Sequence, residues 1–304
     1  MLSVFRARAF NGETGPSSRA FTMSTHATRS PLHPDIAFVG GGNMVRSLLG
    51  GLVAHGHPVA SLSVCEPESV LRAALARDFG IRCGEENRAA ARAEVLVLAV
   101  KPQVIRDVCL ELAPALADPR PLVLSIAAGV RIGQIESWLG HGLSIVRAMP
   151  NTPALVGAGV AGLHANARAT PIERARAEEI LSATGSTVWV EREDLLDAVT
   201  AVSGSGPAYC FLLMEAMEQA AIEQGLAPAI ARELSVQTAL GAARMARQSS
   251  DEPAELRARV TSPGGTTAAA LEVLEQRDFR GLVAAAIDAA TRRARALSHE
   301  LDAS

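Results

Sequence analysis

The stretch Asp35-Ile-Ala-Phe-Val-Gly-Gly-Gly-Asn-Met44 decides the fold of this chain. A short apolar run passes through three glycines and continues into a helical pattern. A strand, a glycine turn and a helix in this order bring backbone N–H groups close to a pyrophosphate at the helix N-terminus. The turn fits G-x-G-x-x-(G/A) except at Val45, whose branched side chain we expect to push the helix slightly outward. The stretch therefore predicts a dinucleotide site.

Apolar runs and helical patterns continue to alternate after this turn. The predicted strands are 36–40, 62–65, 95–100, 122–126 and 145–148, and the helices between them are 44–54, 69–79, 103–112 and 132–139. Two further β-like runs, 160–164 and 187–190, flank a helix that starts near Pro171 and ends near Gly185. Strands that are apolar on both faces and separated by helices form a doubly wound parallel sheet. We therefore expect an α/β fold with a Rossmann domain over residues 35–193.

The β pattern disappears after about residue 194. Helices are predicted at 207–224, 228–247, 253–259, 266–275 and 279–297, with Pro207 and Pro228 in first turns and Gly225 at a helix end. The first two are apolar or small-sided on several faces, and such helices must be buried on several sides. A helical domain of this size has little interior. We therefore expect residues 194–304 to form an all-helical dimerisation and substrate-binding domain that packs against a second subunit.

Composition excludes several classes of protein. Of the 304 residues 20% are charged and the net charge is −3, so no surface for nucleic acid is expected. No apolar run approaches the roughly 18 residues of a membrane span. The four cysteines lie far apart and the seven histidines do not cluster, which argues against a metal or redox site and favours a reducing compartment. We expect a soluble cytoplasmic protein.

Residues 1–34 differ from the rest of the chain. They hold Arg6, Arg8, Arg19 and Arg29, several serines and threonines, and a single acid, Glu13. This composition is typical of a mitochondrial transit peptide and also of an unstructured extension. A third alternative is that translation begins at Met23. We expect a disordered leader or a misassigned start.

The second predicted strand ends at Glu66. An acid at this position accepts hydrogen bonds from the adenosine ribose hydroxyls and repels a 2′-phosphate, which favours NADH. In the alternative interpretation Glu66 is solvated while Ser69 and Arg72 meet the 2′-phosphate of NADPH. Both cofactors therefore stay open, with Glu66 favouring NADH.

Two more strand ends carry candidate site residues. Val100-Lys-Pro-Gln103 follows a strand at the carboxyl edge of the sheet, where ligands bind. Lys101 either neutralises a phosphate or substrate acid, or is a solvated lysine beside a proline that starts the next helix. Ile126-Ala-Ala-Gly129 ends a strand with small residues and leaves room for a nicotinamide ring.

Two glycine-rich segments precede helices in the second domain, Ser203-Gly-Ser-Gly-Pro207 and Ser262-Pro-Gly-Gly-Thr-Thr267. A loop of small residues at a helix N-terminus presents N–H and hydroxyl donors together, which suits a carboxylate. Ordinary helix capping needs only one Ser or Thr. The second segment has two glycines followed by two threonines, more than a cap requires, and it predicts an anion site.

These segments together resemble the pyrroline-5-carboxylate reductase family. The resemblance rests on Phe38-Val-Gly-Gly-Gly-Asn-Met44, Val100-Lys-Pro-Gln103, Arg147-Ala-Met-Pro-Asn-Thr-Pro153, Asp197-Ala-Val-Thr-Ala-Val-Ser-Gly-Ser-Gly-Pro-Ala-Tyr209 and Val260-Thr-Ser-Pro-Gly-Gly-Thr-Thr267. It covers the chain from Asp35 to the C-terminal helix. It implies reduction of 1-pyrroline-5-carboxylate to L-proline by NADPH or NADH, the last step of proline synthesis. It also implies a helical domain that interlocks in homodimers, which often assemble further into decamers.

The resemblance also implies site residues. The cofactor is expected to contact Val39, Gly40, Gly41, Gly42, Asn43, Met44, Asn87, Val100, Lys101, Pro102 and Ala127. The substrate carboxylate is expected at the loop that contains Ser262, Gly264, Gly265, Thr266 and Thr267. The catalytic hypothesis is that Ser262 and the glycine amides fix the carboxylate while Thr267 orients or protonates the ring nitrogen. The chain departs from some relatives at Arg259, where they carry Asn near the cofactor.

Two other functions remain as alternatives. One is another NAD(P)H-dependent imine or hydroxyacid reductase on the same two-domain plan. A hydroxyacid dehydrogenase would place a catalytic Lys on an interdomain helix, and the chain has no Lys after Lys101. The other alternative is a non-catalytic dinucleotide-sensing protein whose helical domain binds partners.

Overall fold

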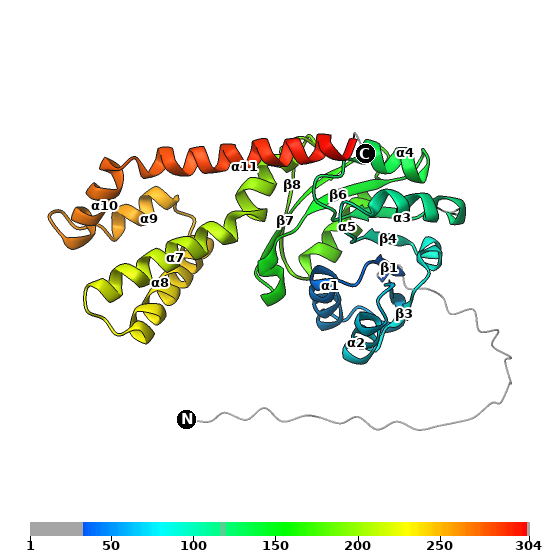
Figure 1. The fold of residues 1–304 in the computed structure, drawn as a ribbon, viewed down its shortest axis with the longest axis horizontal. Coiled ribbons are helices and arrows are strands. Elements are labelled where there is room, and N and C mark those ends of the chain that lie inside the picture. Colours follow the sequence, from blue (N-terminus) through cyan, green and yellow to red (C-terminus); the bar gives the residue numbers. More distant parts are fainter. Residues whose placement is uncertain (1–32, 117, 119, 303–304) are drawn as a thin grey trace, which may run out of the picture.

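A computed structural model of the chain describes residues 33–116, 118 and 120–302. The leader expected at 1–34 lies outside the described residues except for its last two. The described chain divides into a sheet domain and a helical arm, shown in Figure 1. No helix among the described residues is long and apolar enough to cross a membrane.

The sheet domain is built on one eight-stranded sheet of order β3-β2-β1-β4-β5-β6-β7-β8. The strands are β1 (Ile36–Val39), β2 (Leu62–Cys65), β3 (Arg82–Gly84), β4 (Val95–Leu98), β5 (Leu122–Ser125), β6 (Ile145–Met149), β7 (Gly159–Ala165) and β8 (Gly185–Trp189). The five pairs from β3 to β6 are parallel, as the apolar runs predicted. β2 and β3 follow on one side of β1 and β4 to β6 on the other, so the strand order reverses at β1 and a topological switch point lies at its carboxyl end.

Two features of the sheet differ from the prediction of a purely parallel sheet. β6 and β7 are antiparallel, and β7 and β8 are then parallel to each other. The link from β6 to β7 holds only the short 3₁₀ helix η4 (Thr152–Val156), and a parallel crossover needs a longer connection. The short edge strand β3 was not predicted, because its residues are largely exposed and form no apolar run.

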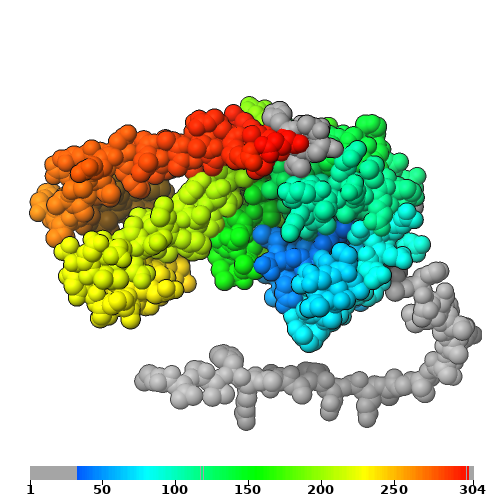
Figure 2. Space-filling view, in the orientation of Figure 1, coloured from blue at the N-terminus to red at the C-terminus, as the bar shows by residue number. Residues whose placement is uncertain are grey.

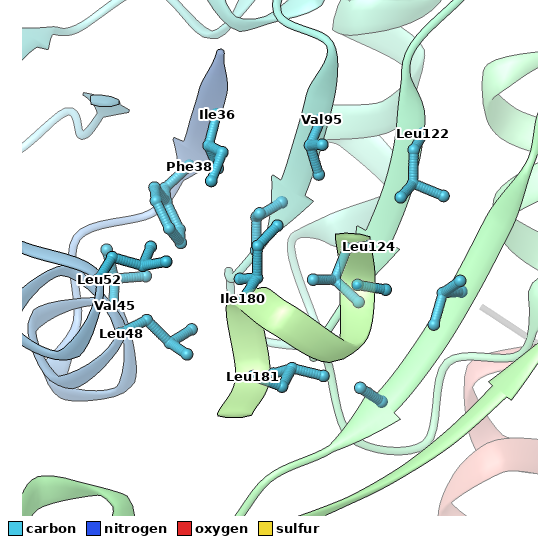
Figure 3. Close-up of a cluster of buried hydrophobic side chains, with 14 of the residues drawn as sticks. Ile36, Phe38, Val45, Leu48, Leu52, Val95, Leu122, Leu124, Ile180 and Leu181 are labelled. Atoms are coloured by element: carbon cyan, nitrogen blue, oxygen red, sulfur yellow. The ribbon is translucent and has the colours of Figure 1, made fainter. Parts of the chain in front are cut away.

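Helices cover both faces of the sheet. They are α1 (Asn43–Ala54), α2 (Ser69–Phe79), α3 (Ile105–Leu112), α4 (Ile132–Leu139) and α5 (Pro171–Ser182), with 3₁₀ helices η1 (Val59–Ser61), η2 (Asn87–Arg92) and η3 (Ala113–Ala115) in the connections. Successive residues of β1 point to opposite faces, so Phe38 packs with α1, α2 and α5 while Val39 packs with α3 and α4. Figure 3 shows Phe38, Val45 and Ile180 in the first of these cores. Val45 is only 1% exposed, so the core accommodates its branched side chain.

The helical arm follows from residue 195. It consists of α6 (Leu195–Val199), the π-helical turn η5 (Thr200–Gly204), α7 (Gly206–Glu223), α8 (Pro228–Gln248), α9 (Pro253–Arg259), α10 (Thr266–Gln276) and α11 (Phe279–Asp302). α7 and α8 pack as a hairpin, and α11 runs back along the arm to pack against α6 and η5. No strand lies among the described residues after β8, as the sequence predicted.

Large apolar side chains are exposed along the arm. Phe211 and Leu212 on α7 are 65% and 66% exposed, and neither α7 nor α10 has a buried residue. Figure 2 shows the arm extending away from the sheet domain. Apolar surface of this extent marks an interaction surface. The prediction that these helices are apolar on more sides than one domain can bury is confirmed.

Candidate active site

The glycine turn lies at the carboxyl end of β1, at the switch point of the sheet. Gly40 has φ +99°, and a Cβ there would lie 2.7 Å from the carbonyl oxygen of Ala99, so only glycine fits. At Gly42, the N-cap of α1, a Cβ would meet nothing within 4 Å, and no side chain caps the helix. The N–H groups of the first turn of α1 are therefore open to an anion. This geometry fits the pyrophosphate of a dinucleotide.

Glu66 lies directly against this turn and is 8% exposed. The N–H of Gly41 donates to Glu66 Oε2 (2.7 Å), and the N–H of Glu68 donates to Oε1 (2.9 Å). Arg72, the alternative phosphate ligand, instead donates to the backbone oxygen of Glu66 (2.8 Å) and pairs with Glu85. The carboxylate is thus fixed at the end of β2, where an adenosine ribose would lie, and the nearby guanidinium is already engaged.

The other cofactor candidates surround the same sheet edge. Val39, Gly40, Gly41 and Ala127 are buried, Met44, Asn87, Val100 and Pro102 are half-buried, and Gly42, Asn43 and Lys101 are exposed. Asn87 donates from Nδ2 to Glu111 Oε2 (2.8 Å). β1, β2, β4 and β5 are adjacent in the sheet, so the structure brings their carboxyl ends together as the sequence predicted.

The segment 203–207 is not a loop, and this prediction was wrong. Residues 200–204 form the π-helical turn η5, which joins α6 to α7 with little interruption. The Ser203 hydroxyl donates to the Val199 carbonyl (2.9 Å), and Asn151 Nδ2 donates to the Ser203 carbonyl (3.0 Å). A Cβ on Gly204 would lie 2.7 Å from Met149 Cε, so the glycine lets η5 pack closely against the end of β6.

The second glycine-rich segment is a loop that ends at the N-terminus of α10. Gly264 has φ +69°, and the N–H of Gly265, the N-cap, donates to the Ser262 carbonyl (3.1 Å). No side chain caps α10, and within the described chain the hydroxyls of Ser262, Thr266 and Thr267 make no hydrogen bond. Capping therefore does not use these hydroxyls. Backbone and hydroxyl donors remain available together at the helix start.

One chain does not bring the two halves of the site together. The loop 262–267 lies between α9 and the start of α10, at the far end of the arm, where α11 also begins. α11 has 24 residues and spans about 36 Å back to the sheet domain. Figure 1 shows α10 at the far end of the arm and α1 beside the sheet. Within one chain, Thr267 therefore does not face the glycine turn.

The structure also contains charged groups that the sequence did not single out. Arg147, in the middle of β6, is 4% exposed and pairs with Glu193 (3.1 Å), and Asp197 of α6 is 2% exposed. Arg147 and Asp197 lie in segments that carried the family resemblance, which was the available signal. Arg259 pairs with Asp251 near the loop 262–267. The described residues contain no cluster of acidic, His or Cys side chains placed to hold a metal.

The fold and the sheet edge define a class of protein. A Rossmann sheet with an open glycine turn, joined to a helical domain with an open donor loop, is the plan of a dinucleotide-dependent oxidoreductase. Family models agree with both halves. Residues 35–129 match "NADP oxidoreductase coenzyme F420-dependent" and residues 193–297 match "Pyrroline-5-carboxylate reductase dimerisation".

Similar proteins identify the family within that class. The chain is 50% identical to pyrroline-5-carboxylate reductase of Pseudomonas aeruginosa over 88% of its length and 98% of the relative, and 40% identical to the Escherichia coli enzyme over 84% and 94%. The solved structure of the Coxiella burnetii reductase superposes with a TM-score of 0.85 at 44% identity, covering 87% of this chain and 98% of that one. The Plasmodium falciparum reductase, solved with NADP bound, superposes with a TM-score of 0.76 at 29% identity and covers 87% and 98%. The chain belongs to the pyrroline-5-carboxylate reductase family.

Proposed function

We propose that this chain reduces 1-pyrroline-5-carboxylate to L-proline with NADH or NADPH, in the last step of proline biosynthesis. One observation carries the proposal. An open dinucleotide turn and an open carboxylate loop occur on one chain that is 50% and 40% identical to two relatives named pyrroline-5-carboxylate reductase. The proposed division is a Rossmann domain over 35–193 and a helical domain over 194–304.

The sheet edge is the proposed cofactor half of the site. The N–H groups at the start of α1 hold the pyrophosphate, Gly40 allows the tight turn that precedes them, and Gly42 allows the backbone to approach the pyrophosphate. Lys101 lies exposed at the end of β4, where its charge complements a phosphate. Ala127 leaves a small-sided floor for the nicotinamide. When bound, the cofactor supplies the hydride, and the chain supplies placement.

The loop 262–267 is the proposed substrate half. Ser262 and the N–H groups of Gly264 and Gly265 hold the carboxylate, and Thr267 orients or protonates the ring nitrogen. A cyclic imine that has taken up one proton is already a good electrophile, and one hydride delivered to its C=N carbon then gives the secondary amine. The protein then needs little acid strength, and orientation can supply on the order of 7–11 kcal/mol of the barrier.

The two halves meet between subunits in this proposal. The exposed apolar side chains of α7 and α10 cover one another in a homodimer, and the loop of one subunit reaches the sheet edge of its partner. An isologous dimer makes two such sites by symmetry. Further assembly of dimers into a decamer and a cytoplasmic location complete the proposal. Light scattering of the purified protein tests the assembly.

Glu66 is the proposed determinant of cofactor preference. Its fixed carboxylate accepts from the ribose hydroxyls of NADH and repels the 2′-phosphate of NADPH. Arg72 is engaged with backbone carbonyls and with Glu85, which supports this choice. Steady-state titration of both cofactors tests it, and a preference for NADPH of more than tenfold would overturn it.

The decisive experiment mixes two inactive chains. Thr267→Ala removes the substrate half and Gly42→Glu blocks the cofactor half, so each homodimer is expected to be inactive. Random heterodimers hold one intact site, which should restore roughly a quarter of wild-type activity in a 340 nm assay with pyrroline-5-carboxylate. No recovery in confirmed heterodimers would place both halves in the same chain and refute the shared site.

The same assay separates the alternatives. A different imine or hydroxyacid reductase would oxidise the cofactor with its own substrate but not with pyrroline-5-carboxylate. A dinucleotide sensor would bind the cofactor without consuming it. Wild-type turnover with pyrroline-5-carboxylate, abolished in Thr267→Ala, is the outcome expected from the proposed function.

A further inference from the structure

The helix α4 follows directly after the loop 127–130, the proposed nicotinamide floor, and a side chain from outside the helix fixes its start. The N–H of Ile132, the first residue of α4, donates to Glu193 Oε1 (2.8 Å). The same oxygen accepts from the buried Arg147 guanidinium (3.1 Å). Glu193 precedes α6, at the junction of the two domains. The position of α4 is therefore set partly by the segment that joins the two domains.

A second acid, Asp197, lies one helical turn after Glu193 and also contacts the start of α4. Asp197 is 2% exposed, and its Oδ2 lies 3.8 Å from Arg131 Nη2 and 3.9 Å from Arg295 Nε. Within the described chain this oxygen makes no hydrogen bond. Arg131 is the N-cap of α4 and the residue that follows the loop 127–130. The attraction between Asp197 and Arg131 is weakly screened because the acid is buried.

The space beside Asp197 joins both cofactor loops. A cavity of about 280 Å³ is lined by Asp197, by Pro102 and Gln103 after β4, and by Ala128 and Gly129 after β5. Leu297 of α11 closes another side. Asp197 therefore lies at the wall where the proposed cofactor loops meet the helical arm, although it is no part of either loop.

We infer that Asp197 is a positioning residue, which holds the nicotinamide-side loop 127–130 through Arg131 so that the cofactor binds a preformed site. This inference rests on the proposed function, because it takes that loop as the nicotinamide floor. Glu193 provides the second anchor on the adjacent residue, Ile132. Leu196 between the two acids is fully buried, so the start of α6 is a rigid support for both.

The test compares charge removal at both ends of the pair. Asp197→Asn keeps the shape of the side chain, and Arg131→Met removes the charge of a side chain that is 32% exposed, so it tests the same contact from its more exposed end. Asp194→Asn is the matched control, because Asp194 lies in the same segment but pairs with Arg192 in solvent. Cofactor Kd is measured by NADH and NADPH fluorescence, together with Tm and the KM for pyrroline-5-carboxylate.

We expect Asp197→Asn and Arg131→Met each to raise cofactor Kd about tenfold, and Arg131→Lys to restore most of the affinity. The double variant should be no weaker than either single variant, because both changes remove one interaction. Tm, substrate KM and the control should stay near wild type. Additive losses, or wild-type Kd in Asp197→Asn, would overturn this inference alone. Failure of the wild type to bind NADH or NADPH would overturn the proposed function and the inference with it.

Discussion

The same substitution is expected to have different effects at two glycines of the turn: alanine at Gly40 should lower Tm, and alanine at Gly42 should raise cofactor Kd. In Gly40→Ala the new Cβ would lie 2.7 Å from the Ala99 carbonyl oxygen and 3.2 Å from Val100 Cγ1, on a backbone with φ +99°. The unfavourable φ costs about 1–2 kcal/mol and the overlap about 1–3 kcal/mol, so we expect a total loss of about 2–5 kcal/mol. Such a loss lowers Tm by roughly 5–15 °C.

Gly42→Ala is the matched substitution. Its φ is −69° and its Cβ would meet no atom within 4 Å, so we expect Tm to stay within a few degrees of wild type. The added methyl instead enters the space proposed for the pyrophosphate, and cofactor Kd should rise about 10–100-fold. Differential scanning fluorimetry gives Tm, and NADH fluorescence gives Kd. Wild-type affinity in Gly42→Ala, or wild-type Tm in Gly40→Ala, would refute this reading of the turn.

Four further predictions test other parts of the structure. Thr267→Ala should lower kcat about 100-fold while cofactor Kd stays within about twofold, and Thr267→Ser should recover part of kcat; unchanged kinetics would remove Thr267 from the mechanism. Glu66→Ser should shift the ratio of kcat/KM values toward NADPH about tenfold, and an unchanged ratio would exclude Glu66 as the determinant. Burial, with a contribution from His33, lowers the pKa of His57 from its ordinary 6.5. Below pH 6.5 the unfolded chain binds a proton at His57 that the folded chain resists, so the folded state loses stability as pH falls from 6.5 through the lowered pKa of His57. This loss is measured as Tm against pH and should be smaller in His57→Gln. Burial raises the pKa of the Cys109 thiol to about 12, so iodoacetamide at pH 8 should leave Cys109 unmodified until the chain unfolds, and early labelling seen by mass spectrometry would contradict its burial.

Local sequence was sufficient to predict those strands and turns whose pattern lies within a few neighbouring residues. β1 and β4 are apolar on both faces, and Gly40 follows a strand directly, so the sheet edge and its turn were predictable. β3 was missed because a short exposed edge strand has no periodic pattern. Its hydrogen bonds come from pairing with β2, which no window of sequence contains.

The segment 200–204 shows a different kind of failure. Ser203, Gly204 and Ser205 have the composition of a loop, yet the first two belong to the π-helical turn η5 and Ser205 leads directly into α7. The Thr200 hydroxyl donates to the Leu196 carbonyl (2.8 Å), and Asn151, 52 residues before Ser203, donates to the Ser203 carbonyl. Tertiary contacts therefore override local propensity at this junction. The pair Arg147–Glu193, 46 residues apart, was unpredictable for the same reason.

The exposed arm and the open loop 262–267 have a common explanation. Burying one Leu or Phe side chain contributes about 1.5–3 kcal/mol, and α7 alone exposes Phe211, Leu212 and Leu213 by half or more. Association of two arms is therefore strongly favoured before any substrate binds. In the proposed dimer, the same association carries the N–H and hydroxyl donors of the loop 262–267 to the sheet edge of the other subunit. In this proposal a monomer would keep both the dinucleotide turn and the loop 262–267 but could not bring them together. In the proposed dimer, subunit assembly and construction of the active site are therefore one event, and the distance between the loop 262–267 and the cofactor turn of the same chain is what this arrangement requires.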